Sequence, residues 1–188
     1  VHVAEGPEDE KDSVAKYGKR IVERFRDHGI TGENSVFVHC IHTDESERDI
    51  IRETNTAVVH NPESNMGNAV GSASVREMIK EGLLVGLGTD GYLCDMIQSY
   101  RLGNALCKHS SGDPGAGWGE LPQMLFVNNA EIAERCFPVR LGMIKEGEIS
   151  LQEAQEGEAA STTAADSAET TTASEDQSGQ TTESTDQT

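Results

Sequence analysis

Three histidines and one aspartate follow one another at intervals of about one βα unit, each at or beside the end of a short apolar segment. They are His2, His39, His60 and Asp90, spaced by 37, 21 and 30 residues. Imidazole and carboxylate groups suit zinc or ferrous iron, and a carboxylate near metal-activated water can also accept its proton. Each residue alone could equally be a hydrogen-bonded structural group, so a metal site depends on whether the fold brings the four together.

Four short segments form continuous apolar runs, which is typical of parallel strands buried on both faces. These predicted strands are Val1–Ala4, Ser35–His39, Thr56–His60 and Leu83–Leu87. Helical patterns separate or follow them: Asp12–His28, a capped helix starting near Asp44, Val75 to a stop at Gly82, Met96–Lys108, and two shorter stretches up to Phe137.

This alternation predicts an α/β fold with about four βα units. Four such units are half of an eight-stranded barrel, or alternatively a small doubly wound sheet. The carboxyl ends of all strands in a parallel barrel open onto one face, where barrel enzymes carry their chemistry. The half-barrel interpretation therefore predicts that the three histidines and the aspartate converge.

Composition divides the chain into two parts. From Leu151 to Thr188 there are 14 Ser/Thr and 9 Asp/Glu but no Lys or Arg, so we expect a disordered tail over 149–188 after a domain spanning 1–148. The net charge of −18 argues against nucleic-acid and anionic-membrane partners, which need a basic surface. No apolar run is long enough to span a membrane, and four cysteines without a C-x-x-C pair favour a cytoplasmic protein.

Two further patterns suggest other kinds of site. The segment Gly86–Gly91 matches G-x-G-x-x-G, a dinucleotide-binding fingerprint. It places Asp90 where the pyrophosphate of a dinucleotide would lie, and the negative carboxylate would repel this anion. His39, Cys40 and His42 are ligand-like residue types, yet neighbouring side chains at a strand end point to opposite sides. Neither pattern outweighs the metal-site interpretation.

Four local motifs, in order, resemble those of the amidohydrolase superfamily. They are His2-Val-Ala-Glu5, Val38-His39-Cys-Ile-His42, His60-Asn-Pro-Glu-Ser-Asn65 and Leu87-Gly-Thr-Asp90-Gly91. The chain is most similar to the cytosine deaminase/atrazine chlorohydrolase-like group, particularly its SsnA-type aminohydrolases. The resemblance runs from Val1 to about Glu148. It implies the carboxyl-terminal half, strands five to eight, of a TIM-type (β/α)8 barrel of a metal-dependent hydrolase.

The resemblance also implies roles for particular residues. His2 and Asp90 correspond to ligands of one divalent metal, zinc first and iron second. Asp90 also accepts a proton from the attacking water, Glu5 protonates the departing nitrogen and His39 orients the attacked centre. His60 and Asn61 correspond to a motif that shapes the substrate pocket.

This sequence departs from the family pattern in two places. It contains no His-x-His pair, which supplies the other two metal ligands in the family, and at Ile149 it turns into the acidic tail instead of completing a small β-sandwich. Because the chain begins at Val1, within the first predicted strand, we expect a preceding segment of a longer protein.

The resulting hypothesis is a metal-dependent hydrolase acting on non-peptide carbon–nitrogen bonds. We expect an aminohydrolase or deaminase of a small heterocyclic or amidine-like substrate. Three protein ligands are usual for catalytic zinc, so we expect the chain alone to be inactive until it pairs with an amino-terminal barrel half. A homo-oligomer is the other partner that we expect. The alternatives are a non-catalytic remnant or interaction module, and a hydrolytic dechlorinase.

Overall fold

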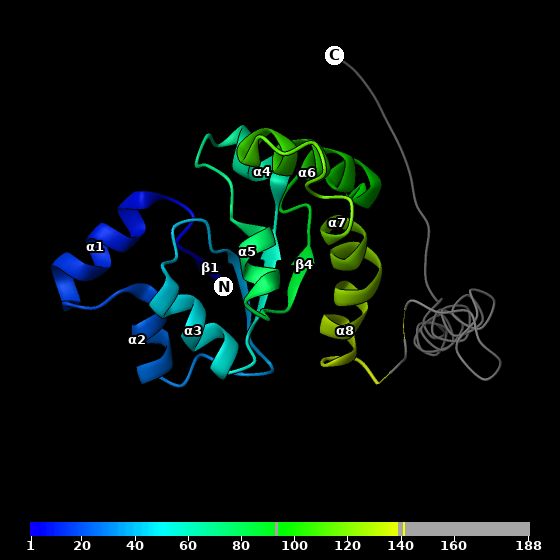
Figure 1. The fold of residues 1–188 in the computed structure, drawn as a ribbon. Helices are drawn as coiled ribbons and strands as arrows, with labels where there is room; N and C mark the ends of the chain where they lie inside the picture. The colour runs from blue at the N-terminus through cyan, green and yellow to red at the C-terminus, as the bar shows by residue number, and fades with distance from the viewer. Residues whose placement is uncertain (93, 139–140, 142–188) are drawn as a thin grey trace, which may run out of the picture. The chain divides into compact units, whose positions relative to one another are not determined.

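The protein forms an α/β fold around a four-stranded parallel sheet (Figure 1). A computed structural model describes residues 1–92, 94–138 and 141. The strands are β1 (His2–Val3), β2 (Val36–His39), β3 (Ala57–His60) and β4 (Val85–Leu87), in spatial order β1-β2-β3-β4. The order never reverses, as it would at the switch point of a doubly wound sheet. The predicted tail, 149–188, lies outside the described residues.

The two faces of the sheet differ in burial. Phe37 on β2, Val58 on β3 and Val85 on β4 are completely buried. Because side chains alternate along a strand, Val38 and Val59 point to the opposite face, and both are only partly buried. The strands were predicted to be buried on both faces. One face of this sheet is fully buried as predicted, and the other is only partly buried.

The helices that connect and follow the strands agree with most of the predicted pattern. They are α1 (Pro7–Tyr17), α2 (Ile21–Asp27), α3 (Glu45–Glu53), α4 (Pro62–Gly67), α5 (Val75–Lys80), α6 (Met96–Ser111), α7 (Glu120–Pro122), the π-helix η1 (Gln123–Asn128) and α8 (Asn129–Glu134). No helix in the described part of the chain is long and apolar enough to cross a membrane.

The prediction of one continuous helix from Asp12 to His28 is wrong. The first helix ends at Tyr17 because Gly18 adopts the left-handed conformation, with φ of 69°, and its N–H bonds to the Val14 carbonyl. Glycine reaches this conformation without the steric cost that other residues meet. The side chains of Val14 and Tyr17 in α1 are exposed.

Helix α3 begins with the predicted capping box. The Asp44 carboxylate accepts the Glu47 N–H at 3.0 Å, and the Glu47 carboxylate accepts the Asp44 N–H at 3.2 Å. Glu47 also accepts the Val22 N–H at 3.0 Å and pairs with Arg20. This buried glutamate therefore ties the start of α3 to the start of α2.

Asparagine side chains cover the outer edge of β4. The Asn129 amide accepts the Leu87 N–H and donates to the Leu87 carbonyl, both at 2.8 Å, while Asn128 donates to the Val85 carbonyl at 2.7 Å. A Cβ at Gly86 would lie 2.5 Å from the Asn129 amide oxygen, so this close approach requires glycine. Helices η1 and α8 thus satisfy backbone groups that an unpaired edge leaves exposed.

Candidate metal centre

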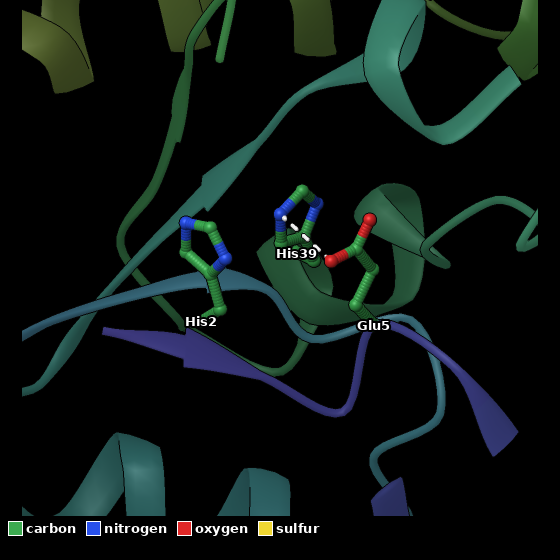
Figure 2. Close-up of side chains that lie close together, drawn as sticks. All are labelled: His2, Glu5 and His39. Carbon is green, nitrogen blue, oxygen red and sulfur yellow. Dashed lines mark ion pairs between the residues drawn. The ribbon is translucent and has the colours of Figure 1, made fainter. Parts of the chain in front are cut away.

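Side chains from the ends of β1 and β2 meet in one cluster. Figure 2 shows His2, Glu5 and His39 pointing toward a common space, and one possible ligand atom from each lies within 4.8 Å of the others. The rings of His2 and His39 meet edge to face, with centroids 5.1 Å apart. His2 is exposed, Glu5 is partly buried and His39 is completely buried.

The backbone is strained where these strands end. Ala4, His39, Cys40 and Asp90 all have positive φ, between 46° and 74°. For residues other than glycine this conformation costs on the order of 1–2 kcal/mol each. Strain of this kind persists where surrounding structure enforces it, and it gathers at functional sites. Its concentration here supports a functional role for these strand ends.

His39 is the centre of the cluster. Its Nδ1 lies 2.8 Å from the Asn65 Oδ1. Its Nε2 lies 3.6 Å from a Glu5 oxygen and 3.4 Å from an Asp90 oxygen, and is buried without a hydrogen bond to any described residue. Such atoms normally have a partner. A buried nitrogen without one, beside two carboxylates, fits a metal-binding environment.

Asp90 joins the cluster from the end of β4 and is held ionised. Its pKa lies below the usual range of an aspartate, chiefly because the Ser64 hydroxyl donates a hydrogen bond to it. The Gly91 N–H donates a further bond at 2.7 Å. Asp90 adjoins the group of His2, Glu5 and His39 through its contact with His39.

Helix α4 supplies residues that the sequence interpretation missed. Ser64 bonds to Asp90, Asn65 to His39, and Asn68 donates to a Glu5 oxygen at 3.2 Å. The sequence carried a signal for this helix, because proline is favoured at the first helical position and Pro62 occupies it. The apolar pattern nevertheless predicts no helix between the strand that ends at His60 and the helix that begins at Val75.

His60 and Asn61 lie beside the cluster. His60 is buried, and its pKa is lowered to about 4, first by burial and then by His39. It reaches the cluster through the Asn65 amide, with 3.4 Å between Nδ2 and the His60 Nδ1. Asn61 is buried against β4, where a Cβ at Gly88 would lie 2.3 Å from its amide oxygen. Their role in shaping a substrate pocket stays a prediction.

A sequence model of the Amidohydrolase family matches residues 1–149. This chain belongs to the amidohydrolase family. The 5'-deoxyadenosine deaminase of Methanopyrus kandleri is 32% identical over 151 residues, which are 78% of this chain and 35% of that protein. The family resemblance of the four sequence motifs is therefore confirmed.

Solved structures show the same fold. A zinc-bound adenosine deaminase from Xanthomonas campestris matches 78% of this amidohydrolase chain and 34% of its own, with a TM-score of 0.71 and 28% identity. The zinc complex of atrazine chlorohydrolase TrzN from Arthrobacter aurescens TC1 matches 78% of this chain and 33% of its own, with a TM-score of 0.63 and 26% identity. The chain spans about a third of the length of each of these proteins.

Proposed function

We propose that this amidohydrolase chain forms the carboxyl-terminal half of a (β/α)8 barrel. The complete barrel removes an amino group from a purine-like or related heterocycle by hydrolysis of the carbon–nitrogen bond. The observation that carries the proposal is the buried, unpartnered Nε2 of His39 between the Glu5 and Asp90 carboxylates. Deaminases among the relatives support the reaction class.

The donors present fit a divalent metal, and zinc-bound relatives favour zinc. In this proposal His2 and Asp90 hold the metal together with ligands from outside this chain, because three protein ligands are usual for catalytic zinc. When bound, the metal acts as a Lewis acid and makes water a better nucleophile.

The chain's own residues move the protons. Asp90 is ionised and can accept a proton from the attacking water, as a general base must. Glu5 lies 3.6 Å from His39, with a side chain 24% exposed, so its carboxyl, once protonated, can give that proton to a leaving nitrogen. The proton that Asp90 takes from water then balances the one that the leaving nitrogen receives. His39 is fixed by Asn65 and orients the attacked centre.

The proposed whole protein requires a second half. This chain spans about a third of each compared protein, and one face of its sheet is only partly covered. We propose that an amino-terminal barrel half supplies the missing ligands and pocket walls. The chain alone is then inactive.

The test combines this chain with the amino-terminal portion of the Methanopyrus kandleri relative. Zinc-loaded mixtures should release ammonia from 5'-deoxyadenosine, and Asp90→Asn should lower the rate at least about 100-fold, since general acid–base groups contribute that much. Asp12→Asn is the matched control, because Asp12 only pairs with Lys16 on the surface of α1. Turnover that survives in Asp90→Asn would contradict the proposed role of this carboxylate.

A hydrolytic dechlorinase is the second candidate, favoured by the match to atrazine chlorohydrolase. The same assay distinguishes the two: chloride release from a chlorotriazine without ammonia release from the nucleoside favours the dechlorinase. Failure of both reactions, with no zinc retained after purification, favours a non-catalytic remnant.

A further inference from the structure

We propose that Asn65 is a positioning residue that selects the tautomer of His39, keeping a hydrogen on Nδ1 and a lone pair on Nε2. The inference deepens the proposed function, because a lone pair at this place can bind a metal or accept a hydrogen from water, whereas an N–H cannot. It concerns a residue of α4 to which no role was assigned from the sequence.

The geometry around Asn65 leads to this assignment. Asn65 is completely buried, and its side chain lies between two buried histidines. Its Oδ1 is 2.8 Å from the His39 Nδ1, and its Nδ2 is 3.4 Å from the His60 Nδ1. An amide oxygen only accepts and an amide nitrogen only donates. His39 therefore carries its hydrogen on Nδ1, and His60 presents a lone pair at Nδ1.

The neighbouring charges favour the opposite tautomer. The Glu5 and Asp90 oxygens lie 3.6 and 3.4 Å from the His39 Nε2, and carboxylates only accept hydrogen bonds when ionised. Alone, they would draw the hydrogen of a neutral His39 onto Nε2. The bond to Asn65 opposes them at Nδ1, so the amide decides which nitrogen is free.

His60 can supply the acceptor that this orientation of the amide needs. Burial keeps His60 neutral, with a pKa of about 4, so it can accept from the Asn65 Nδ2 at neutral pH. A rotated amide would need the hydrogen of His60 on Nδ1 instead. Metal-binding histidines generally donate their second nitrogen to an oxygen acceptor, which fixes the tautomer and ring orientation. Here a side-chain amide, held by a second histidine, is that acceptor.

The test is nitrogen NMR of the full 188-residue chain with labelled histidine, without metal or substrate, at about pH 8, where ordinary histidines are neutral. We expect the Nδ1–H tautomer for His39. Asn65→Asp keeps an acceptor and should preserve this tautomer, whereas Asn65→Leu should shift it to Nε2–H. Asn104→Leu is the matched control, a helical asparagine in α6 that bonds to the Gly117 carbonyl.

A zinc titration gives a second measurement. The His39 Nε2 lies 3.4 Å from Asp90, a proposed ligand, and a hydrogen placed on Nε2 would compete with the metal for that carboxylate. Asn65→Leu should therefore weaken zinc binding by about 10- to 100-fold, as loss of an outer-shell partner does, and Asn65→Asp should restore most of it. An Nε2–H tautomer in the unsubstituted chain overturns the proposal, as does an unchanged spectrum in folded Asn65→Leu.

If Asn65→Leu does not fold, the His39 tautomer in the unsubstituted chain and in Asn65→Asp tests the proposal. The Nδ1–H tautomer in both supports the proposal, and Nε2–H in either contradicts it. The tautomer is measured without turnover, so the NMR result does not depend on whether the proposed reaction occurs.

Discussion

Two polar clusters in this protein have the same formal excess of negative charge. The Arg20 cluster joins α1, α2 and α3 and contains one guanidinium and the carboxylates of Glu10, Asp44 and Glu47. The candidate metal centre contains the carboxylates of Glu5 and Asp90 with two histidines. With neutral histidines and ionised acids, each cluster carries two negative charges. The two differ in how that excess is neutralised.

The Arg20 cluster is closed by hydrogen bonds and a proton. Arg20 lies 2.8 Å from both Asp44 and Glu47, and it donates to the His42 carbonyl at 2.7 Å. Burial, and then the Glu47 charge, raise the pKa of Glu10 to about 7. A proton on Glu10 removes part of the excess charge. The Glu10 Oε1 is buried without a hydrogen bond to a described residue, and it belongs to the carboxyl that this proton neutralises.

The candidate metal centre differs at the carboxylate that follows β4. The pKa of Asp90 is lowered, and the His39 Nε2 stays buried without a hydrogen bond to a described residue. Perturbed ionisable groups occur at both structural and functional sites, so the pKa shift alone does not distinguish them. Each cluster holds one buried atom without a hydrogen bond to a described residue, the Glu10 Oε1 and the His39 Nε2. They differ because a proton can neutralise the Glu10 carboxyl, whereas a divalent cation would satisfy an imidazole nitrogen that lies beside two carboxylates.

Removing the guanidinium should have the largest effect on folding. Arg20→Met leaves the fully buried Glu47 without its charge partner and should lower the free energy of unfolding by about 3–5 kcal/mol. Urea denaturation of the chain measures this loss. Lys16→Met, which removes an exposed pair, is the control, and its loss should be far smaller because solvent screens an exposed pair. Similar losses in the two variants would contradict a structural Arg20 cluster.

Asp90→Asn should act on metal binding rather than on folding. We expect zinc affinity to fall by at least about 100-fold, the upper end of what loss of a ligand's hydrogen-bond partner costs. Isothermal titration of zinc into the chain, alone or paired with an amino-terminal half, measures the change. Unaltered affinity would remove Asp90 from the proposed ligands.

Glu10→Gln should change how stability depends on pH. In the unfolded chain Glu10 ionises near its ordinary pKa of 4.5, whereas the folded chain keeps the proton up to about pH 7. The folded state therefore binds more protons between these values, and Glu10 lowers stability as pH rises through that window. Unfolding midpoints at several pH values should show this fall reduced in Glu10→Gln.

His60 acts in the opposite direction in part of the same window. Its folded pKa of about 4 lies below its ordinary 6.5, so its contribution is lost as pH falls from 6.5 toward 4. The difference between the parent chain and Glu10→Gln isolates Glu10. Glu8→Gln is the control, because Glu8 is exposed. Identical pH profiles for the parent and Glu10→Gln would contradict the raised pKa.

Glu5→Gln should have the smallest effect on stability, within about 0.5 kcal/mol. Its side chain is 24% exposed, and its described hydrogen bond, from Asn68, is one that an amide oxygen can also accept. Denaturation of this variant, compared with Arg20→Met, contrasts the two clusters directly. A loss of several kcal/mol would make Glu5 a structural residue.

Much of the fold could be predicted because its signals are local. The apolar runs marked all four strands, and the capping box marked α3, since both depend on residues a few positions apart. The first predicted helix failed because its periodicity continued through Gly18, whose left-handed backbone ends α1. Helix α4 was missed because it is six residues long and lacks an apolar pattern.

The sequence by itself determined the four motifs, their order and the family. Tertiary structure alone decided how the candidate site is assembled. Asn65 meets His39 across 26 residues, and Asn68 meets Glu5 across 63. Such partners meet only once β1, β2 and α4 have packed, because hydrogen bonds act over about 3 Å and leave no periodic trace in the chain. The lone pair of His39 therefore depends on packing that the sequence motifs do not specify.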